Sequence, residues 1–390
     1  MARSDTFQFV HVTRVVAGPG SSDQAGAELR ALGGTRAIIV TDRGIAASQL
    51  LGKLEPGLER AGIAYEVFDE IEPNPAAAAV ERAAERARRG GADAVLAIGG
   101  GSPIDAGKMV AVLAKFGGAV RDYEGIDTVS GPTLPLLAVP TTVGTGSEVT
   151  RGAVITDTDR SAKMVVVSPH IFPRVAILDP LLLERLPPAI TAATGMDSLT
   201  QALEGYVSRG ANPISDALNL EALRLIAENL RLAVARNDPD ALGKMQVATT
   251  MQGIGFHNAG LGLVHAMSNT IGGMFGTAHG VTNAVILPHV MTFNVGADPT
   301  RFARVAEAMG EPIDGLSVRA AADRAIEAVR MLAADVGIPS TLAEIGVDAA
   351  AIPEMARIAM TGIDAPTNPR HFTEEDIVVL YRRSFGLPDS

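Results

Sequence analysis

The first half of the chain alternates short apolar runs with helical segments, and this alternation restricts the fold more than any other feature of the sequence. Residues 75–91 are rich in Ala, Glu and Arg, which favours a helix. Alternating strands and helices build a parallel sheet with both faces covered, so we predict an α/β domain over residues 1–185. The runs with strand character end in polar turns or glycines, at residues 35–42, 64–69, 94–102, 134–142 and 174–180.

The pattern of apolar residues changes near residue 185. Most segments beyond it have helical period or a high content of Ala and Leu, as in residues 214–236 and 318–337. We therefore predict that residues 186–390 form a second domain that is all-α. The fold class that follows is an α/β domain followed by a helical domain.

Composition excludes several classes of function. The 390 residues carry a formal net charge of −11 and include no Trp, so binding to nucleic acid is disfavoured. No Cys is present, which excludes disulfides, thiolate metal ligands and cysteine nucleophiles, and which fits a cytoplasmic protein. No apolar stretch reaches the length of about 18 residues that marks a membrane-spanning helix. We therefore expect a cytoplasmic protein with no nucleic acid partner and no membrane segment.

A glycine-rich loop joins the apolar run at 94–102 to a helical segment. Gly100, Gly101 and Ser102 stand at this turn, where backbone N–H groups and the start of a helix favour a phosphate. A plain tight turn would explain the glycines without any ligand. Three consecutive glycines followed by a serine, between a strand and a helix, favour phosphate binding over that explanation.

Two further regions at the ends of predicted strands are candidates for contact with a nucleotide. Asp42 ends the run at 35–42, where a carboxylate accepts hydrogen bonds from ribose hydroxyls and repels a 2′-phosphate, which favours NAD over NADP. A helix cap or a turn explains Asp42 equally well. The loop at residues 139–150 is dense in Thr, Ser and Gly, and it offers several donors to a ligand.

A polar pair lies in residues 194–208, a segment that we predict to be a helix with apolar residues on nearly every face. Asp197 and Gln201 are about one turn apart, so both side chains point the same way and need partners if that face is buried. Their partner is either a metal ion or the protein itself. His265 and His279 stand in an apolar, glycine-rich segment. Two imidazoles and one carboxylate suit Fe²⁺ or Zn²⁺, with a position left open for substrate.

The chain carries four motifs whose order and separation can be compared with known families. They are GGGSPIDAGK (99–108), PTTVGTGSEVT (140–150), TGMDSLTQALEGYVS (194–208) and VHAMSN with AHG (264–280). In this order they resemble the iron-dependent alcohol dehydrogenases of group III, over essentially the whole chain. The resemblance implies a Rossmann-like N-terminal domain and a helical C-terminal domain, the architecture that dehydroquinate synthase shares. It also implies NAD(P), a divalent metal and a homo-oligomer that is at least a dimer.

The resemblance carries functional roles onto individual residues. Asp197, His265 and His279 match the positions of metal ligands and would hold the catalytic ion. The residues implied to bind the cofactor are Gly100, Gly101, Ser102 and Asp105 at the pyrophosphate, Thr141, Thr142 and Lys163 along the cofactor, and Asp42 and Asn74 near the adenosine ribose.

Two positions depart from the pattern of the family. The family usually has histidine where this chain has Gln201 and Asn269. Gln201 can still bind a metal through its amide oxygen, but that oxygen matches Fe²⁺ or Zn²⁺ less well than an imidazole, so we expect weaker affinity. Asn269 does not titrate near neutral pH and cannot shuttle a proton as a histidine would.

The function that we expect is metal-assisted hydride transfer between a small alcohol or aldehyde and a nicotinamide cofactor. NAD is expected rather than NADP, and Fe²⁺ is expected with Zn²⁺ as the alternative. His257 would lie on roughly the same face as His265 if one continuous helix held both, and it would then support the site.

Three other functions stay open on the sequence. A reductase of the maleylacetate type or a hydroxyacid–oxoacid transhydrogenase would use the same architecture. A lyase like dehydroquinate synthase would need a pocket rich in Lys and Arg, and near the predicted metal helix the sequence offers only Arg209. A protein that binds NAD but has lost catalysis is the third alternative.

Overall fold

The computed structural model describes residues 6–160 and 162–389. The chain forms two compact units, one of His11–Arg185 and one of Leu186–Ser390 together with Met1–Val10. The N-terminal segment is tied to the second unit because the backbone N–H of Val10 donates to Oδ1 of Asn258 across 2.7 Å.

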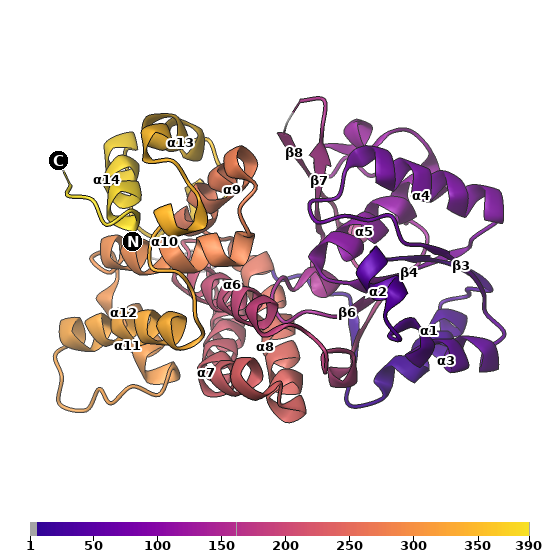
Figure 1. Ribbon diagram of the computed structural model, residues 1–390, viewed down its shortest axis with the longest axis horizontal. Coiled ribbons are helices and arrows are strands. Elements are labelled where there is room, and N and C mark those ends of the chain that lie inside the picture. The colour runs from indigo at the N-terminus through magenta and orange to yellow at the C-terminus, as the bar shows by residue number, and fades with distance from the viewer. Residues whose placement is uncertain (1–5, 161, 390) are drawn as a thin grey trace. The chain divides into compact units, whose positions relative to one another are not determined.

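The first unit is built on a six-stranded sheet in which every neighbouring pair is parallel (Figure 1). The parallel α/β architecture predicted for this half of the chain is therefore confirmed. In spatial order the strands are β1 (Arg14–Ala17), β9 (Val175–Leu178), β6 (Leu136–Pro140), β4 (Ala94–Gly99), β2 (Arg36–Val40) and β3 (Ala64–Phe68).

Helices cover both faces of this sheet and bury two apolar layers. Ile38 and Val40 of β2 pack into one layer, and Ala37 and Ile39 pack into the other, because successive side chains of a strand point to opposite faces. Burial on both faces explains why the strands read as unbroken apolar runs. Figure 1 shows α4 (Ala77–Gly90) and α5 (Gly101–Phe116) on one side of the sheet, and α1 (Ala25–Ala31) and α3 (Glu55–Arg60) on the other.

A second, smaller sheet of three strands was not expected from the sequence. Its order is β5 (Gly125–Ile126), β8 (Ala162–Val167) and β7 (Gly152–Asp157), and β7 and β8 form an antiparallel pair. The strands escaped notice because β5 has only two residues and because β7 and β8 are only partly buried, so their residues do not form the continuous apolar runs that mark the main sheet.

The second unit consists of helices, as predicted. Proline stands at the start of several of them, where its missing N–H costs nothing, and Asn212, Asp238 and Asp298 cap the helices that follow them. The helices are α6 (Pro188–Val207), α7 (Pro213–Arg236), α8 (Pro239–Ala259), α9 (Leu263–Phe275), α10 (His279–Asn294), α11 (Pro299–Ala308), α12 (Val318–Asp335), α13 (Ile352–Ala359) and α14 (Glu374–Ser384).

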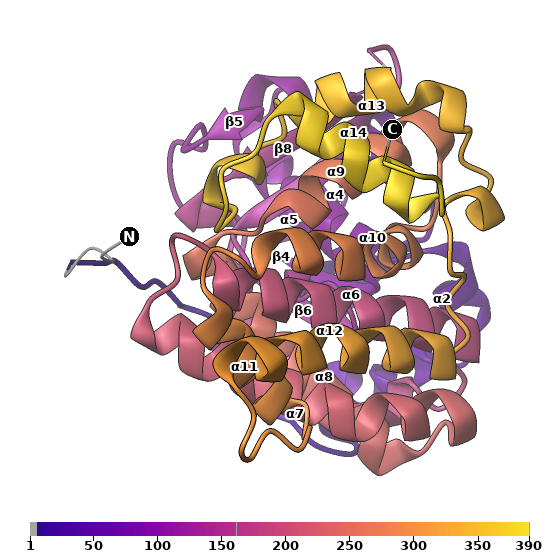
Figure 2. The same ribbon diagram turned by 90° about the vertical axis from the view of Figure 1, so that its left-hand side faces the viewer.

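Helix α6 lies at the centre of the helical unit. It packs against α7, α8 and α10 (Figure 2). Most of its side chains are buried. This position explains why the segment reads as apolar nearly all round, and it places the polar residues of α6 in the interior. No helix within the described residues combines the length and the apolar character needed to cross a membrane.

Candidate functional site

Three helices of the second unit bring together a carboxylate and two imidazoles. Oδ1 of Asp197 on α6 lies 3.9 Å from Nε2 of His265 on α9 and 3.6 Å from Nε2 of His279 at the start of α10. All three possible ligand atoms lie within 4.8 Å of one another. Asp197 and His265 are buried, whereas the His279 side chain is 42% exposed. The cluster is therefore accessible to solvent from the side of His279.

A glycine lets α10 approach α6 closely enough to form this cluster. A Cβ atom on Gly280 would lie 2.1 Å from the carbonyl oxygen of Ala193 and 3.2 Å from Cβ of Asp197. Any larger residue at this position would push the start of α10 away from α6. His279 precedes Gly280 directly, so the contact of the two helices sets the distance between His279 and Asp197.

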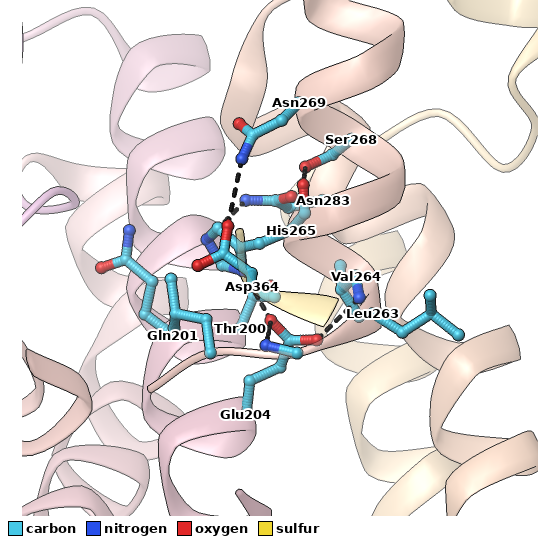
Figure 3. A network of polar contacts seen from close by, with 12 residues as sticks. Thr200, Gln201, Glu204, Leu263, Val264, His265, Ser268, Asn269, Asn283 and Asp364 are labelled. Atoms are coloured by element: carbon cyan, nitrogen blue, oxygen red, sulfur yellow. Dashed lines mark hydrogen bonds and ion pairs between the residues drawn. The ribbon is translucent and has the colours of Figure 1, made fainter. Parts of the chain in front are cut away.

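A second buried carboxylate orients His265. Oε2 of Glu204 accepts a hydrogen bond from Nδ1 of His265 across 2.6 Å, and the same carboxylate accepts the backbone N–H groups of Gly262 and Val264 (Figure 3). A carboxylate accepts only, so Nδ1 of the imidazole carries a proton, and when the imidazole is neutral its Nε2 keeps a lone pair facing Asp197. This arrangement of carboxylate, histidine and metal-facing nitrogen is typical of the outer shell of metal sites.

The charges around His265 change its affinity for protons. Burial by itself would lower the pKa of His265, but the hydrogen bond to Glu204 and the negative charges of Glu204 and Asp197 outweigh it and raise the pKa to about 8. A divalent cation would meet the same negative environment that stabilises the proton.

Two amide side chains border the cluster. Nε2 of Gln201 donates to Oδ2 of Asp197 across 3.1 Å, and Nδ2 of Asn283 donates to Oδ1 of Asp197 across 2.7 Å. The amide oxygens of both residues are buried and have no hydrogen-bond partner among the residues that the structure describes. Buried oxygens without partners, next to a carboxylate and two imidazoles, fit a site for a divalent cation.

Asn269, the second residue that departs from the family pattern, contacts another acid. Nδ2 of Asn269 donates to Oδ2 of Asp364 across 3.3 Å, in the loop that follows α13 (Figure 3). Burial raises the pKa of Asp364 to about 6, although the charge of His265 acts in the opposite direction. Asp364 is thus a titratable group beside the position where Asn269 lacks one.

The suggestion that His257 and His265 share one helix is wrong. Helix α8 ends at Ala259, Gly260 adopts the left-handed region with φ of 80°, and α9 begins at Leu263. The two histidines therefore stand on separate helices, and their spacing of eight residues does not place them on a common face.

In the first unit, the predicted nucleotide residues gather at the carboxyl ends of adjacent strands. Asp42 follows β2, Gly100 follows β4, and Thr141 follows β6, and these three strands are neighbours in the sheet. The chain runs outward from β2 to β3 and then returns to the other side of β2 as β4. Ligands of parallel α/β sheets bind outside the carboxyl ends of strands at such a reversal.

The glycine loop fits closely against the loop that follows β6. The backbone N–H of Thr141 donates to the carbonyl oxygen of Gly99 across 2.9 Å. A Cβ atom on Gly101 would lie 2.8 Å from Cγ2 of Thr145, and one on Gly100 would lie 3.3 Å from Cγ2 of Thr142. The glycines are thus needed for packing within the protein, whether or not a phosphate binds there. Ser102 lies in the first turn of α5.

Two carboxylates of the predicted cofactor site already have partners within the protein. Asp42 caps α2 (Arg43–Ala47), accepting the backbone N–H of Ile45 across 2.9 Å. Asp105 accepts the hydroxyl of Ser147 across 2.5 Å and the backbone N–H of Val154 across 3.0 Å. The fully buried Lys108, which the sequence reading overlooked, donates to Asp105 and to three other oxygens, from Ser147, Thr150 and Gly152.

Asn74 and Lys163 are brought together, although they are 89 residues apart in sequence. Nζ of Lys163 donates to Oδ1 of Asn74 across 2.6 Å and to Oγ1 of Thr156 across 3.0 Å. Asn74 itself adopts the left-handed region with φ of 59°. Lys163 is on β8 of the small sheet, and this contact links it to the segment that follows β3.

Four residues of the two sites were missed by the reading of the sequence. Two of them could have been found from helical spacing. Glu204 stands seven residues after Asp197 on the same face of α6, and Asn283 stands four residues after His279 on the same face of α10. Lys108 contacts Asp105 three residues before it, but its other partners come from distant parts of the chain, as does the partner of Asp364.

The chain is similar to known proteins over almost its whole length. Residues 12–180 match the family described as iron-containing alcohol dehydrogenase, and residues 191–385 match its C-terminal domain family. The chain is 44% identical to 1,3-propanediol dehydrogenase of Klebsiella pneumoniae over 371 residues, which are 94% of this chain and 96% of that protein. It is 40% identical to NAD-dependent methanol dehydrogenase of Bacillus methanolicus over 370 residues, 95% and 97% of the two chains.

A solved structure extends the comparison to the fold. The crystal structure of a 1,3-propanediol oxidoreductase superposes with a TM-score of 0.96 at 43% sequence identity, and it covers 97% of this chain and 100% of its own. The resemblance inferred from the four motifs is therefore confirmed over both units. The chain belongs to the iron-containing alcohol dehydrogenase family.

Proposed function

We propose that this protein is an NAD-linked alcohol dehydrogenase that depends on a divalent metal and interconverts a small alcohol and its aldehyde. Membership of the family makes it an oxidoreductase acting on a CH–OH group. The observation that carries the proposal is the convergence of Asp197, His265 and His279 from three separate helices.

Four residues would hold the metal. Asp197, His265 and His279 supply one carboxylate and two imidazoles, and the unpartnered amide oxygen of Gln201 would supply a further donor. Fe²⁺ suits these ligands, with Zn²⁺ as the alternative. When bound, the ion would act as a Lewis acid toward the oxygen of the alcohol or aldehyde.

The chain itself prepares this site. Glu204 fixes the proton of His265 on Nδ1, so that Nε2 faces Asp197. The exposed edge of His279 leaves the cluster open to a small substrate. Asn269 cannot exchange a proton, but Asp364 beside it can hold or release one. The substrate proton would therefore leave by a route that does not require residue 269.

The first unit would bind the cofactor along the ends of β2, β4 and β6. Gly100, Gly101 and Ser102 would face the pyrophosphate, with Thr141, Thr142 and Lys163 along the rest of the dinucleotide. Asp105 would act indirectly, because its carboxylate holds the segment around Val154 to α5. Asp42 and Asn74 would lie near the ribose. The carboxylate of Asp42 favours NAD over NADP, and the methanol dehydrogenase of Bacillus methanolicus, a relative of this chain, is NAD-dependent.

The relatives indicate which substrates to test first. The names of two relatives specify 1,3-propanediol and methanol, which are short alcohols. We propose a short alcohol or diol for this chain as well. A cytoplasmic location and assembly into a homo-oligomer, at least a dimer, belong to the same proposal.

The experiment that tests the proposal measures NADH formation. The purified protein is loaded with Fe²⁺ or Zn²⁺ and assayed with NAD and NADP on a series of short alcohols, with His265→Ala as the matched variant. The proposal predicts turnover with NAD that is lost on chelation and in His265→Ala. Bound metal and bound NAD without turnover of any alcohol or aldehyde would instead favour a protein that has lost catalysis.

A further inference from the structure

We propose that Asn283 is a ligand of the metal, and that its side-chain amide rotates by a half-turn when the metal binds. Nothing in the family pattern or in the motifs assigns a role to this residue. The inference rests on the proposed function, because it needs a cation at Asp197, His265 and His279. It adds an oxygen ligand that could replace the imidazole missing at position 201.

The amide of Asn283 contacts the same atoms that would bind a cation. Its Nδ2 atom lies 2.7 Å from Oδ1 of Asp197, 3.1 Å from Nε2 of His279 and 3.4 Å from Nε2 of His265. Glu204 holds a proton of His265 on Nδ1, so Nε2 of the neutral imidazole presents a lone pair. The NH₂ group of Asn283 therefore faces an oxygen of Asp197 and a ring nitrogen of each histidine, and it stands where positive charge is favoured.

The distances are those expected between ligands of one ion. Ligand atoms that are each about 2.1 Å from a common cation lie roughly 3 to 3.4 Å from one another. The amide of Asn283 is spaced in this way from the two histidines, at 3.1 and 3.4 Å, and it lies closer to Asp197, at the hydrogen-bond distance of 2.7 Å. An NH₂ group has no lone pair for a cation, so in this orientation the amide can only compete with it.

A half-turn of the amide removes this conflict. Oδ1 and Nδ2 of an asparagine are almost equal in size, so the turn exchanges the two atoms without displacing neighbours. Oδ1 of Asn283 is buried and has no partner within the residues that the structure describes, so no hydrogen bond holds it in its present place. After the turn, the oxygen would face the cation together with Asp197, His265 and His279.

The position of Asn283 in the fold keeps its side chain beside the cluster. The residue is fully buried, and it stands one helical turn after His279 on the same face of α10. The close contact of Gly280 with Ala193 fixes this part of α10 against α6. The amide is thus held at the cluster by the backbone, and only its orientation needs to change.

Two substitutions distinguish a ligand from a group that only positions Asp197. Zn²⁺ affinity is measured by equilibrium dialysis, and thermal unfolding is measured after chelation. Asn283→Leu should bind Zn²⁺ at least tenfold more weakly, because a ligand is lost. Asn283→Asp should lower the unfolding temperature of the chelated protein, because two carboxylates then meet, and should bind Zn²⁺ at least tenfold more tightly. Zn²⁺ binding in Asn283→Asp that is no tighter than in the wild type would overturn the inference.

A matched control and the wild type separate this inference from the proposed function. Asn229 on α7 is also buried, and its Nδ2 atom donates to the carbonyl oxygen of Leu225. Asn229→Leu and Asn229→Asp should alter the unfolding temperature but change Zn²⁺ affinity by less than twofold. If the wild type does not bind Zn²⁺, or binds it no more tightly than His265→Ala does, both the proposed function and this inference are overturned. Normal wild-type binding with unchanged affinity in Asn283→Leu would overturn this inference alone.

Discussion

Nδ1 of His265 donates its proton to Oε2 of Glu204 across 2.6 Å, in the interior of the helical unit. Glu204 also accepts the backbone N–H groups of Gly262 and Val264, at the point where α9 begins. One carboxylate on α6 therefore fixes both the start of α9 and the orientation of the imidazole that α9 carries. The predictions below test whether this arrangement serves a metal ion.

Glu204→Gln should weaken metal binding about 10- to 100-fold, because the substitution replaces an acceptor oxygen by an NH₂ group that faces donors. Competition with a chelator gives the affinity for Zn²⁺. Glu228→Gln is the control, since Glu228 is exposed on α7 and pairs with Arg224. Equal affinities in Glu204→Gln and the wild type would show that Glu204 does not act on the metal site.

The stability of the chelated protein should fall between about pH 6 and about pH 9. The pKa of His265 is raised to about 8, above its value of about 6.5 in an unfolded chain. The protonated imidazole therefore adds stability below about pH 6.5, and this is lost as the pH rises through 8. The expected loss is about 2 kcal/mol, measured by denaturant unfolding across the range.

His265→Gln is the reference for this pH series. Between about pH 6 and about pH 9, the free energy of unfolding of this variant should fall by about 2 kcal/mol less than that of the wild type, because a glutamine does not titrate. Parallel curves for the two proteins would mean that His265 does not carry a raised pKa.

Gly280→Ala should disturb the metal cluster through the backbone. The new Cβ atom would overlap the carbonyl oxygen of Ala193, so α10 must shift and take His279 away from Asp197. We expect a loss of about 1–3 kcal/mol in unfolding free energy together with weaker metal binding. Gly272→Ala on α9 is the matched control, because its Cβ would meet no atom within 4 Å. It should leave metal binding unchanged and raise stability by up to about 1 kcal/mol.

Asp42→Gly should shift cofactor preference toward NADP. The carboxylate is the group expected to repel a 2′-phosphate, and glycine keeps the cap of α2 at a cost of only a few tenths of a kcal/mol. Asp42→Ser retains a capping oxygen without the charge, and it should shift the preference in the same direction. The ratio of kcat/KM for NAD and NADP gives the result, and an unaltered ratio in both variants would leave Asp42 with the helix cap as its only role.

Several parts of this account could be read from the sequence because they depend on local patterns. Apolar runs and helical period gave the parallel sheet and the helical unit. Asp197, His265 and His279 stand in motifs whose order matches one family. The structure adds that Asp197, Gln201 and Glu204 form one line along α6, a pattern of i, i+4 and i+7 that is visible in the sequence once the helix is known.

Other parts depend on contacts between distant segments. Nothing near Asp105 shows that Ser147 and Val154 bind its carboxylate, and nothing near Asn269 shows that Asp364 lies beside it. Asn283 was missed for a different reason. Metal ligands are sought among His, Asp, Glu and Cys, so this asparagine was passed over although it is four residues from His279.

The most direct test of the account is the metal content of the helical cluster. Wild type, Asp197→Ala and His265→Ala are dialysed against Zn²⁺ or, without oxygen, against Fe²⁺, and the bound metal per chain is determined by elemental analysis. We predict one tightly held ion per chain in the wild type and a loss of it in both variants, with each protein still folded. Equal metal content in all three proteins would contradict the claim that Asp197 and His265 hold the ion.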